Sequence, residues 1–209
     1  MKTGAIVQAR LGSTRLPRKQ LLEIPEGSGV TVLERVVKPL MASEILGAVI
    51  VTTPDYELVR FCKVKGYQSY RWQGARDPLG ELWHAAKRHK LDVIVRITAD
   101  CPLMRTDIVD GVLEEFFTNG MVDYAYNHHD SDMGRGDGLD VEVFTLSVLH
   151  KAHISAYTAY DREHVTPWIR RHSRTMKTKA PNEESLSLNT MDDFKKISDI
   201  MRRGKRDEA

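Results

Sequence analysis

The segment QARLGSTRLPRK, residues 8–19, concentrates positive charge directly after a short apolar run. Arg10 and Arg15 carry guanidinium groups that bind a phosphate through two parallel hydrogen bonds, and Lys19 adds a movable point charge. Cations this close together repel one another unless water solvates them or an anion binds between them. The segment therefore predicts an anion-binding loop, and a solvated surface loop is the alternative.

Small residues in the same segment strengthen the prediction of an anion site. Gly12 permits backbone angles that turn N–H groups toward an anion, and Ser13 adds a hydroxyl donor. The segment lacks the Lys-Ser/Thr pair of a Walker A loop and the GxGxxG pattern of dinucleotide-binding folds. The chemistry thus suits a triphosphate, although neither standard phosphate motif is present.

A carboxylate follows another apolar run in VRITADCPL. Asp100 stands at the end of this run, before Cys101 and Pro102 turn the chain. Because Mg²⁺ prefers one or two carboxylates together with phosphate oxygens, Asp100 is a candidate magnesium ligand. The alternative is an aspartate that caps the helix after Pro102.

A pair of carboxylates occurs in GLDVEVF. Asp140 and Glu142 are two residues apart in a predicted strand, so their side chains are expected on one face. Such a pair could bind substrate hydroxyls or a cation. A solvent-facing strand edge is the alternative.

Apolar β-type runs alternate with helical stripes along most of the chain. The predicted strands are residues 5–9, 47–53, 67–71 and 92–98, and the predicted helices are residues 31–41, 56–66, 78–89 and 107–117. Repeated βα units predict a Rossmann-like α/β fold, with a mostly parallel sheet covered by helices on both faces. Ligands of such sheets bind beyond the carboxyl ends of the strands, where the basic segment and Asp100 both lie.

The pattern changes from residue 121. VDYAYN and LDVEVF predict strands of a small β-containing excursion, residues 162–172 a helix, and residues 185–189 a late strand. Thr190 and Asp193 predict a capping box at the start of a final helix. Because no linker separates these elements, we expect one domain over residues 1–209, with residues 121–172 as a candidate subdomain within it.

The composition excludes several classes of protein. The 209 residues are 41% hydrophobic, and 31 Lys and Arg nearly balance 29 Asp and Glu, which argues against a nucleic-acid binder. No apolar run approaches the roughly 20 residues of a membrane helix. Two cysteines without metal-type spacing fit a reducing compartment. We expect a cytoplasmic protein with no nucleic-acid or membrane partner.

The pattern Arg-x-Gly-Ser-x-Arg-x-Pro-x-Lys in IVQARLGSTRLPRKQL resembles the N-terminal signature of a known enzyme family. That family is the cytidylyltransferases that activate acidic sugars: CMP-sialate and CMP-Kdo synthetases and, above all, the spore-coat polysaccharide biosynthesis protein F group. The resemblance implies a three-layer αβα nucleotidyltransferase fold, similar to GT-A, whose first loop wraps the triphosphate of CTP. It implies that this nucleotide contacts Ala9, Arg10, Gly12, Ser13, Arg15 and Lys19.

The segment VRITADCPL is similar to the TGDCPL segment of the same family. The resemblance implies that Asp100 holds Mg²⁺ and that Arg96 and Thr98 face the cytosine. The family's late Asp-Thr-Pro-Glu-Asp pattern supplies a second metal ligand from its first aspartate. This chain has LNTMDDF there, with Asn189 at that position. An amide oxygen can still bind the metal, but the lost negative charge predicts a lower metal affinity.

Two further segments, RGDGLDVEVF and DREHVTPWI, resemble RGLDVEVFS and REHVTPYI of the spore-coat group. The resemblance implies a pocket for a small anionic sugar or a related acceptor. Its expected residues are Asn127, Asp140, Glu142, Arg162, Glu163 and His164. The same resemblance makes residues 121–172 a candidate surface for acceptor binding or for a homodimer, and the sequence leaves the oligomeric state open.

The sequence thus predicts a Mg²⁺-dependent cytidylyltransferase that moves CMP from CTP to an acidic acceptor and releases pyrophosphate. Its expected catalytic residues are Arg10, Arg15, Lys19 and Asp100. One alternative is a glycosyltransferase that uses a nucleotide sugar, but a single aspartate follows RIT where that class carries Asp-x-Asp. The other is a non-catalytic nucleotide-binding protein, which Asn189 would favour.

Overall fold

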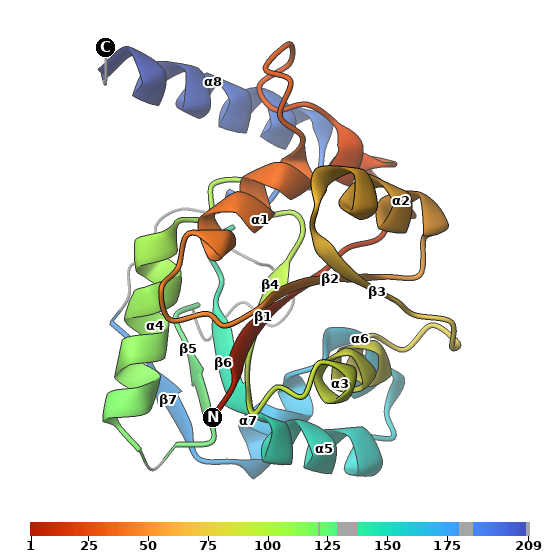
Figure 1. The fold of residues 1–209 in the computed structure, drawn as a ribbon, viewed down its shortest axis with the longest axis vertical. Coiled ribbons are helices and arrows are strands. Elements are labelled where there is room, and N and C mark those ends of the chain that lie inside the picture. Colours follow the sequence, from red (N-terminus) through yellow and green to blue (C-terminus); the bar gives the residue numbers. More distant parts are fainter. Residues whose placement is uncertain (121, 129–137, 180–185, 208–209) are drawn as a thin grey trace.

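A single mixed sheet organises the computed structural model, which describes residues 1–120, 122–128, 138–179 and 186–207. Within these residues the strand order is β3-β2-β1-β4-β6-β5-β7 (Figure 1). The strands are β1 (Thr3–Gln8), β2 (Val49–Thr53), β3 (Gln68–Arg71), β4 (Val93–Thr98), β5 (Tyr124–Tyr126), β6 (Glu142–Thr145) and β7 (Thr175–Lys177). The first four run parallel, whereas β6 is antiparallel to both neighbours, so the predicted α/β class is confirmed.

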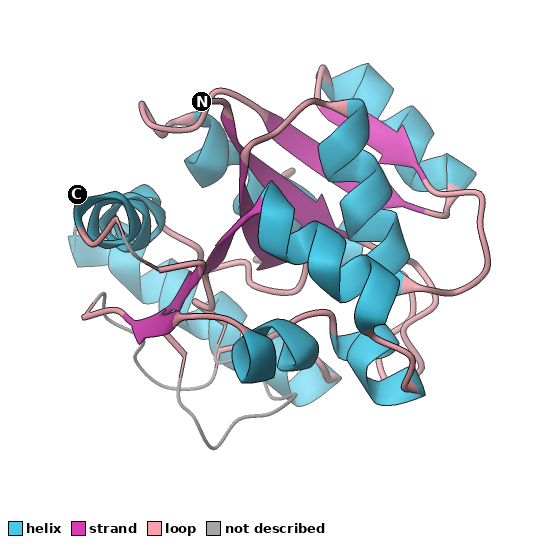
Figure 2. Cartoon of the chain, turned by 90° about the horizontal axis from the view of Figure 1, so that it is seen from below, coloured by secondary structure: helices cyan, strands magenta, loops and turns pink. Residues whose placement is uncertain are grey.

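Helices cover both faces of the sheet, which gives the three layers visible in Figures 1 and 2. One face carries α1 (Val32–Met41), α2 (Tyr56–Lys65) and α4 (Thr106–Thr118). The other carries α3 (Pro78–Arg88), α5 (Leu146–Ser155), the short α6 (Ala159–His164) and α7 (Pro167–His172). Among the described residues, no helix is long and apolar enough to cross a membrane.

The central strand shows why the apolar runs form this sheet. In β1, Ala5 and Val7 pack in the core beneath α1 and α4, whereas Ile6 packs in the core beneath α3 and α5. All three side chains are fully buried, because successive residues of a strand point to opposite faces and both faces are covered. The continuous apolar run that predicted a buried strand is therefore explained.

The last helix begins with the predicted capping box. The backbone N–H of Asp193 donates to the Thr190 hydroxyl, and the backbone N–H of Thr190 donates to the Asp193 carboxylate at 2.7 Å. Helix α8 (Met191–Asp207) and the segment after β1 share a small core that includes Leu16, Ile24 and Leu188. This core ties the end of the chain to the predicted anion loop.

Two predicted strands differ from the observed ones. The strand expected in LDVEVF begins only at Glu142, so Asp140 does not share a strand face with it and that prediction is wrong. Residue 185 lies outside the described residues, and residues 186–189 form no strand. Their backbone instead contacts the end of β4, where the Leu188 N–H donates to the Asp100 carbonyl at 2.8 Å.

The helix predicted over residues 162–172 is divided into α6 and α7. Val165 between them has a φ of 73°, a conformation that is strongly unfavourable for a β-branched residue. The Thr166 N–H donates to the His164 carbonyl at 2.9 Å, which closes a γ-turn. Because the residues on both sides have helical periodicity, the sequence did not predict this interruption.

The candidate subdomain 121–172 contributes β5 and β6 to the main sheet, and its separate role stays a prediction.

Candidate active site

A cavity of about 570 Å³ lies at the carboxyl ends of the parallel strands. Its wall includes Gln8 at the end of β1, Pro54 after β2 and Thr98 at the end of β4. The volume falls within the range of about 300–1,000 Å³ that is typical of small-molecule sites. Eleven of the predicted site residues line it: Ala9, Arg10, Gly12, Ser13, Arg15, Lys19, Arg96, Thr98, Asp100, Glu163 and Asn189.

The basic loop is closed by its own backbone. The Leu11 N–H donates to the Asp55 carboxylate at 2.7 Å, and the Arg18 N–H donates to the Leu11 carbonyl at 3.0 Å. Arg18 has a φ of 59° and binds Glu57, so its side chain does not line the cavity. Closure thus separates Arg18 from the other cations of the loop.

Gly12 does not use the left-handed backbone conformation that glycine permits. Arg18 has that conformation within this loop instead. A Cβ atom placed on Gly12 would meet no described atom within 4 Å. The glycine is therefore not required by packing inside the chain, and its backbone borders open space in the cavity.

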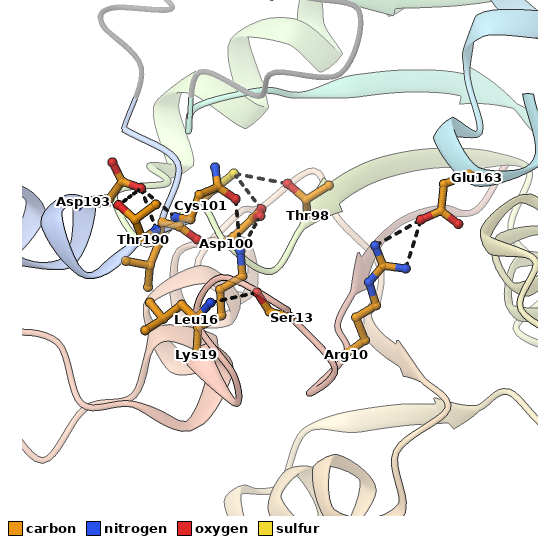
Figure 3. Close-up of polar contacts among 12 residues, drawn as sticks. Arg10, Ser13, Leu16, Lys19, Thr98, Asp100, Cys101, Glu163, Thr190 and Asp193 are labelled. Atoms are coloured by element: carbon orange, nitrogen blue, oxygen red, sulfur yellow. Dashed lines mark hydrogen bonds and ion pairs between the residues drawn. The ribbon is translucent and has the colours of Figure 1, made fainter. Parts of the chain in front are cut away.

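Lys19 lies in a cage of oxygens at one end of the cavity (Figure 3). Its ammonium donates to Asp100 Oδ2 at 2.9 Å, to the Leu188 carbonyl at 2.6 Å and to Asn189 Oδ1 at 3.4 Å. The two predicted metal ligands thus converge on one cation. Hard oxygen donors that converge beside a phosphate-sized cavity fit Mg²⁺, which takes few protein ligands and completes its shell with phosphate and water.

Arg10 lies at the other end of the cavity and faces α6 (Figure 3). Both of its terminal nitrogens donate to Glu163 Oε1 at 3.1 Å, and Arg76 donates to the same oxygen at 2.7 Å. Glu163 therefore holds two arginines that reach the cavity from different loops. Arg76 was missed by the sequence reading, because it stands alone after a short strand and belongs to no recognisable motif.

Comparison with known proteins decides the family. A model of the family described as "Cytidylyltransferase" matches residues 4–203. The chain belongs to the cytidylyltransferase family. It is therefore a nucleotidyltransferase, and its resemblance to that family is confirmed.

Several relatives of this cytidylyltransferase cover most of its length. An uncharacterised protein of Methanocaldococcus jannaschii is 36% identical over 170 residues, 81% of this chain and 67% of that protein. The spore coat polysaccharide biosynthesis protein SpsF of Bacillus subtilis is 28% identical over 92% of this chain and 83% of that protein. A solved cytidylyltransferase from Leptospira borgpetersenii superposes with a TM-score of 0.82 at 31% identity, over 95% of this chain and 85% of that one.

A more distant structure supports the fold alone. It is a CMP:2-keto-3-deoxy-manno-octonic acid synthetase complexed with CTP, with a TM-score of 0.77 at 14% identity. The superposition covers 98% of the cytidylyltransferase described here and all of that chain. The predicted nucleotidyltransferase fold is thus confirmed.

Glu142 of this cytidylyltransferase does not line the cavity, contrary to the acceptor role expected from its motif. It is buried and bonded to Arg96, while Tyr124 and Thr166 each donate to its Oε1 at 2.6 Å. Burial alone would raise the pKa of Glu142, but Arg96, His128 and Thr166 together lower it well below its usual range. The carboxylate is therefore held charged inside the fold.

Arg96 connects the buried Glu142 to the cavity wall, because it binds Glu142 and also lines the cavity. Its Nε donates to Gln8 Oε1 at 2.8 Å, and Gln8 Nε2 donates to the Pro78 carbonyl at 3.0 Å. The chain of contacts runs from Glu142 through Arg96 and Gln8 to the first turn of α3. Arg96 thus lines the cavity as expected, with its guanidinium oriented by neighbours on both sides.

Four other predicted acceptor residues do not line the cavity either. Asn127 is buried, donates to the Leu139 carbonyl and accepts from the Val141 N–H at 2.8 Å. Arg162 binds Asp77 with Nε to Oδ1 at 2.9 Å. The His164 ring packs against Tyr160, and Asp140 lies just before β6. Of the predicted acceptor residues, Glu163 reaches the cavity.

Proposed function

We propose that the chain transfers CMP from CTP to an acidic sugar or a related anionic acceptor and releases pyrophosphate, with Mg²⁺. One observation carries the proposal. One cavity is lined by Arg15, by Lys19 with the convergent oxygens of Asp100 and Asn189, and, at its other end, by Arg10. Cations can neutralise phosphate charge and oxygen ligands can bind Mg²⁺, so their presence in one cavity matches a metal-bound triphosphate.

The chain's residues would act mainly by positioning and charge stabilisation. Arg15 would donate to the phosphate oxygens and help orient the α-phosphorus toward the acceptor, while Lys19, held by its cage of oxygens, would add positive charge nearby. An acceptor oxygen attacks the α-phosphorus and forms a new P–O bond. The bond between the α-phosphorus and the oxygen that bridges to the β-phosphate breaks, and pyrophosphate leaves with the electron pair. When bound at Asp100 and Asn189, Mg²⁺ would neutralise charge on the phosphate oxygens. A carboxylate or phosphate acceptor needs no general base for this step.

The acceptor is proposed from chemistry and from relatives. Glu163 binds Arg10 and Arg76, so the cavity mouth holds two guanidinium groups outside the oxygen cage around Lys19. Guanidinium groups bind carboxylates as readily as phosphates. A related protein acts in spore coat polysaccharide synthesis, which supports a sugar acceptor.

The test is a pyrophosphate-release assay with CTP, Mg²⁺ and a panel of acidic sugars. We expect Arg15→Ala and Asp100→Ala each to slow release at least about 100-fold, by analogy with oxyanion donors. The matched control is Arg18→Asn, in the same loop but paired with Glu57 outside the cavity. Asparagine tolerates the left-handed backbone at that position, so this variant should keep wild-type turnover. Unchanged turnover in both cavity variants would refute the proposal.

Two further outcomes decide against it. Triphosphate binding without turnover across the acceptor panel would indicate a nucleotide sensor. Consumption of a nucleotide sugar instead of CTP would indicate a glycosyltransferase.

A further inference from the structure

The wall of the cavity farthest from Asp100 differs in chemistry from the oxygen cage. The sheet order β3-β2-β1-β4 places residues that follow β2 and β3 on the other side of β1 from Asp100, which follows β4. Trp72, Pro54 and Pro78 line the cavity there, beside charged residues of the same segments, Asp55, Arg76 and Asp77. The flat indole suits a planar heterocycle better than a phosphate.

The indole of Trp72 is fixed in place on this wall. Its ring N–H donates to the Ala75 carbonyl at 2.8 Å. A Cβ atom on Gly74 would lie 2.2 Å from the indole Cζ2 atom, so only glycine allows this close approach. The His84 ring packs at a centroid distance of 5.1 Å. A fixed indole at the cavity wall offers a stacking surface for a nucleobase.

A buried carboxyl group shares this end of the cavity. Glu81 of α3 lines the cavity and is 8% exposed. Its Oε1 accepts from the Thr52 hydroxyl at 2.9 Å. Within the described ranges, no group donates to its second oxygen, Oε2. One carboxyl oxygen is therefore available to a ligand.

The surroundings of Glu81 make a donor from the ligand favourable. Burial raises the pKa of Glu81 to about 7, against the effects of the Thr52 hydroxyl and of Arg10. The carboxylates of Asp55 and Asp77 raise it further. Above that pKa, the ionised carboxylate, which has lost water and lies near other acids, gains much from an N–H donor.

We propose that Glu81 selects the nucleobase by accepting a hydrogen bond from an exocyclic amino group, so that cytosine is preferred to uracil. Cytosine presents the N4 amino donor at the position where uracil presents a carbonyl oxygen, and a carboxylate accepts only the former. Trp72 would support the ring face while Glu81 reads its edge. The inference rests on the proposed function, because it assumes that a nucleoside triphosphate occupies the cavity.

Calorimetric titration with CTP and UTP in the presence of Mg²⁺ tests this assignment. We expect the wild-type protein to bind CTP about 10- to 100-fold more tightly than UTP. Glu81→Gln should lower this ratio at least about tenfold, because a side-chain amide can also donate to the uracil carbonyl. The matched control is Glu34→Gln, a buried glutamate bound to Lys65 and Thr31 outside the cavity, which should keep the wild-type ratio.

A second measurement needs no mutation. The 4-deamino analogue of CTP lacks the proposed donor and should bind the wild-type protein about tenfold more weakly than CTP. This result would support the assignment even if Glu81→Gln fails to fold. A wild-type CTP to UTP ratio in folded Glu81→Gln, or equal affinity for CTP and its analogue, would overturn it.

The outcomes separate this inference from the proposed function. A wild-type protein that binds CTP and UTP equally, yet releases pyrophosphate, would overturn the role of Glu81 and leave the transferase proposal standing. A protein that binds no triphosphate would overturn both.

Discussion

Two regions of the molecule carry motif residues of the cytidylyltransferase family, and they use their charges differently. In the basic loop, Arg10 and Arg15 are exposed at the cavity and Lys19 reaches it from its cage of oxygens. On the β4–β6 side, Arg96 lines the cavity but binds Glu142, which is buried and does not line it. The first region presents its cations to the cavity, whereas the carboxylate of the second lies inside the fold.

The difference shows that a family motif can have two physical origins. Arg10 binds Glu163 and Lys19 donates to three oxygens, yet both cations line the cavity, where we propose that they also face an anion. The charge of Glu142 has at least three partners, and a buried carboxylate without them would be strongly unfavourable. Both regions lie within the stretch that matches the family, residues 4–203, so a sequence match alone does not distinguish ligand contacts from internal support.

Glu142→Gln tests whether this carboxylate supports the fold, and we expect it to change stability more than any other substitution considered below. The substitution leaves the partly buried Arg96 guanidinium without its counter-charge, which should lower the free energy of unfolding by about 3 kcal/mol. Thermal denaturation should show a fall in Tm of about 6–12 °C for a domain of this size. Arg15→Ala, an exposed cavity residue, should change the free energy of unfolding by no more than about 0.5 kcal/mol.

The pH dependence of the same pair gives an independent check. Because the pKa of Glu142 is lowered in the folded protein, its charge stabilises the fold above the unfolded pKa of about 4.3. This stabilisation is lost as pH falls below that value toward the lower pKa of the folded state. The stability difference between wild type and Glu142→Gln should therefore shrink in acid. A difference that stays constant from pH 7 to pH 3 would contradict the ion-pair account.

The sequence predicted the fold better than it predicted the acceptor side. Apolar runs such as residues 5–9 report burial directly, and the capping residues Thr190 and Asp193 act locally, so both were predictable. The partner of Glu142 is 46 residues away on β4, and no pattern in either segment encodes that pairing. The γ-turn at Val165 was likewise hidden, because it forms against the preferences of its own residue.

Asn189→Asp tests whether the oxygens around Lys19 bind Mg²⁺. Adding a carboxylate beside Asp100 should increase Mg²⁺ affinity, because the charge of the ligand set controls binding of hard cations. We expect the Mg²⁺ concentration for half-maximal pyrophosphate release to fall about tenfold. Substitutions next to metal ligands typically change metal affinity by about 10- to 100-fold. Thermal stability should change little, unlike that of Glu142→Gln. An unchanged Mg²⁺ requirement would remove Asn189 from the metal site.

Thr190→Ala should have a smaller effect than the substitutions above. Thr190 both caps helix α8 and supports the backbone next to Asn189. Its hydroxyl accepts from the Asp193 N–H, and Asp193 in turn accepts from the Asn189 N–H at 3.0 Å. Loss of the cap should cost about 1 kcal/mol of stability and loosen the backbone that presents Asn189. We therefore expect both a small fall in Tm and a several-fold higher Mg²⁺ requirement.

Thr31→Ala is the matched control, because Thr31 forms the same kind of capping box with Glu34 at the start of α1 and does not line the cavity. It should cost a similar stability, about 1 kcal/mol, without changing the Mg²⁺ requirement. The two caps are equivalent as helix stabilisers, and only one of them adjoins the oxygen cage around Lys19. Equal Mg²⁺ requirements in the two variants would therefore mean that the start of α8 supports the fold but does not position a metal ligand.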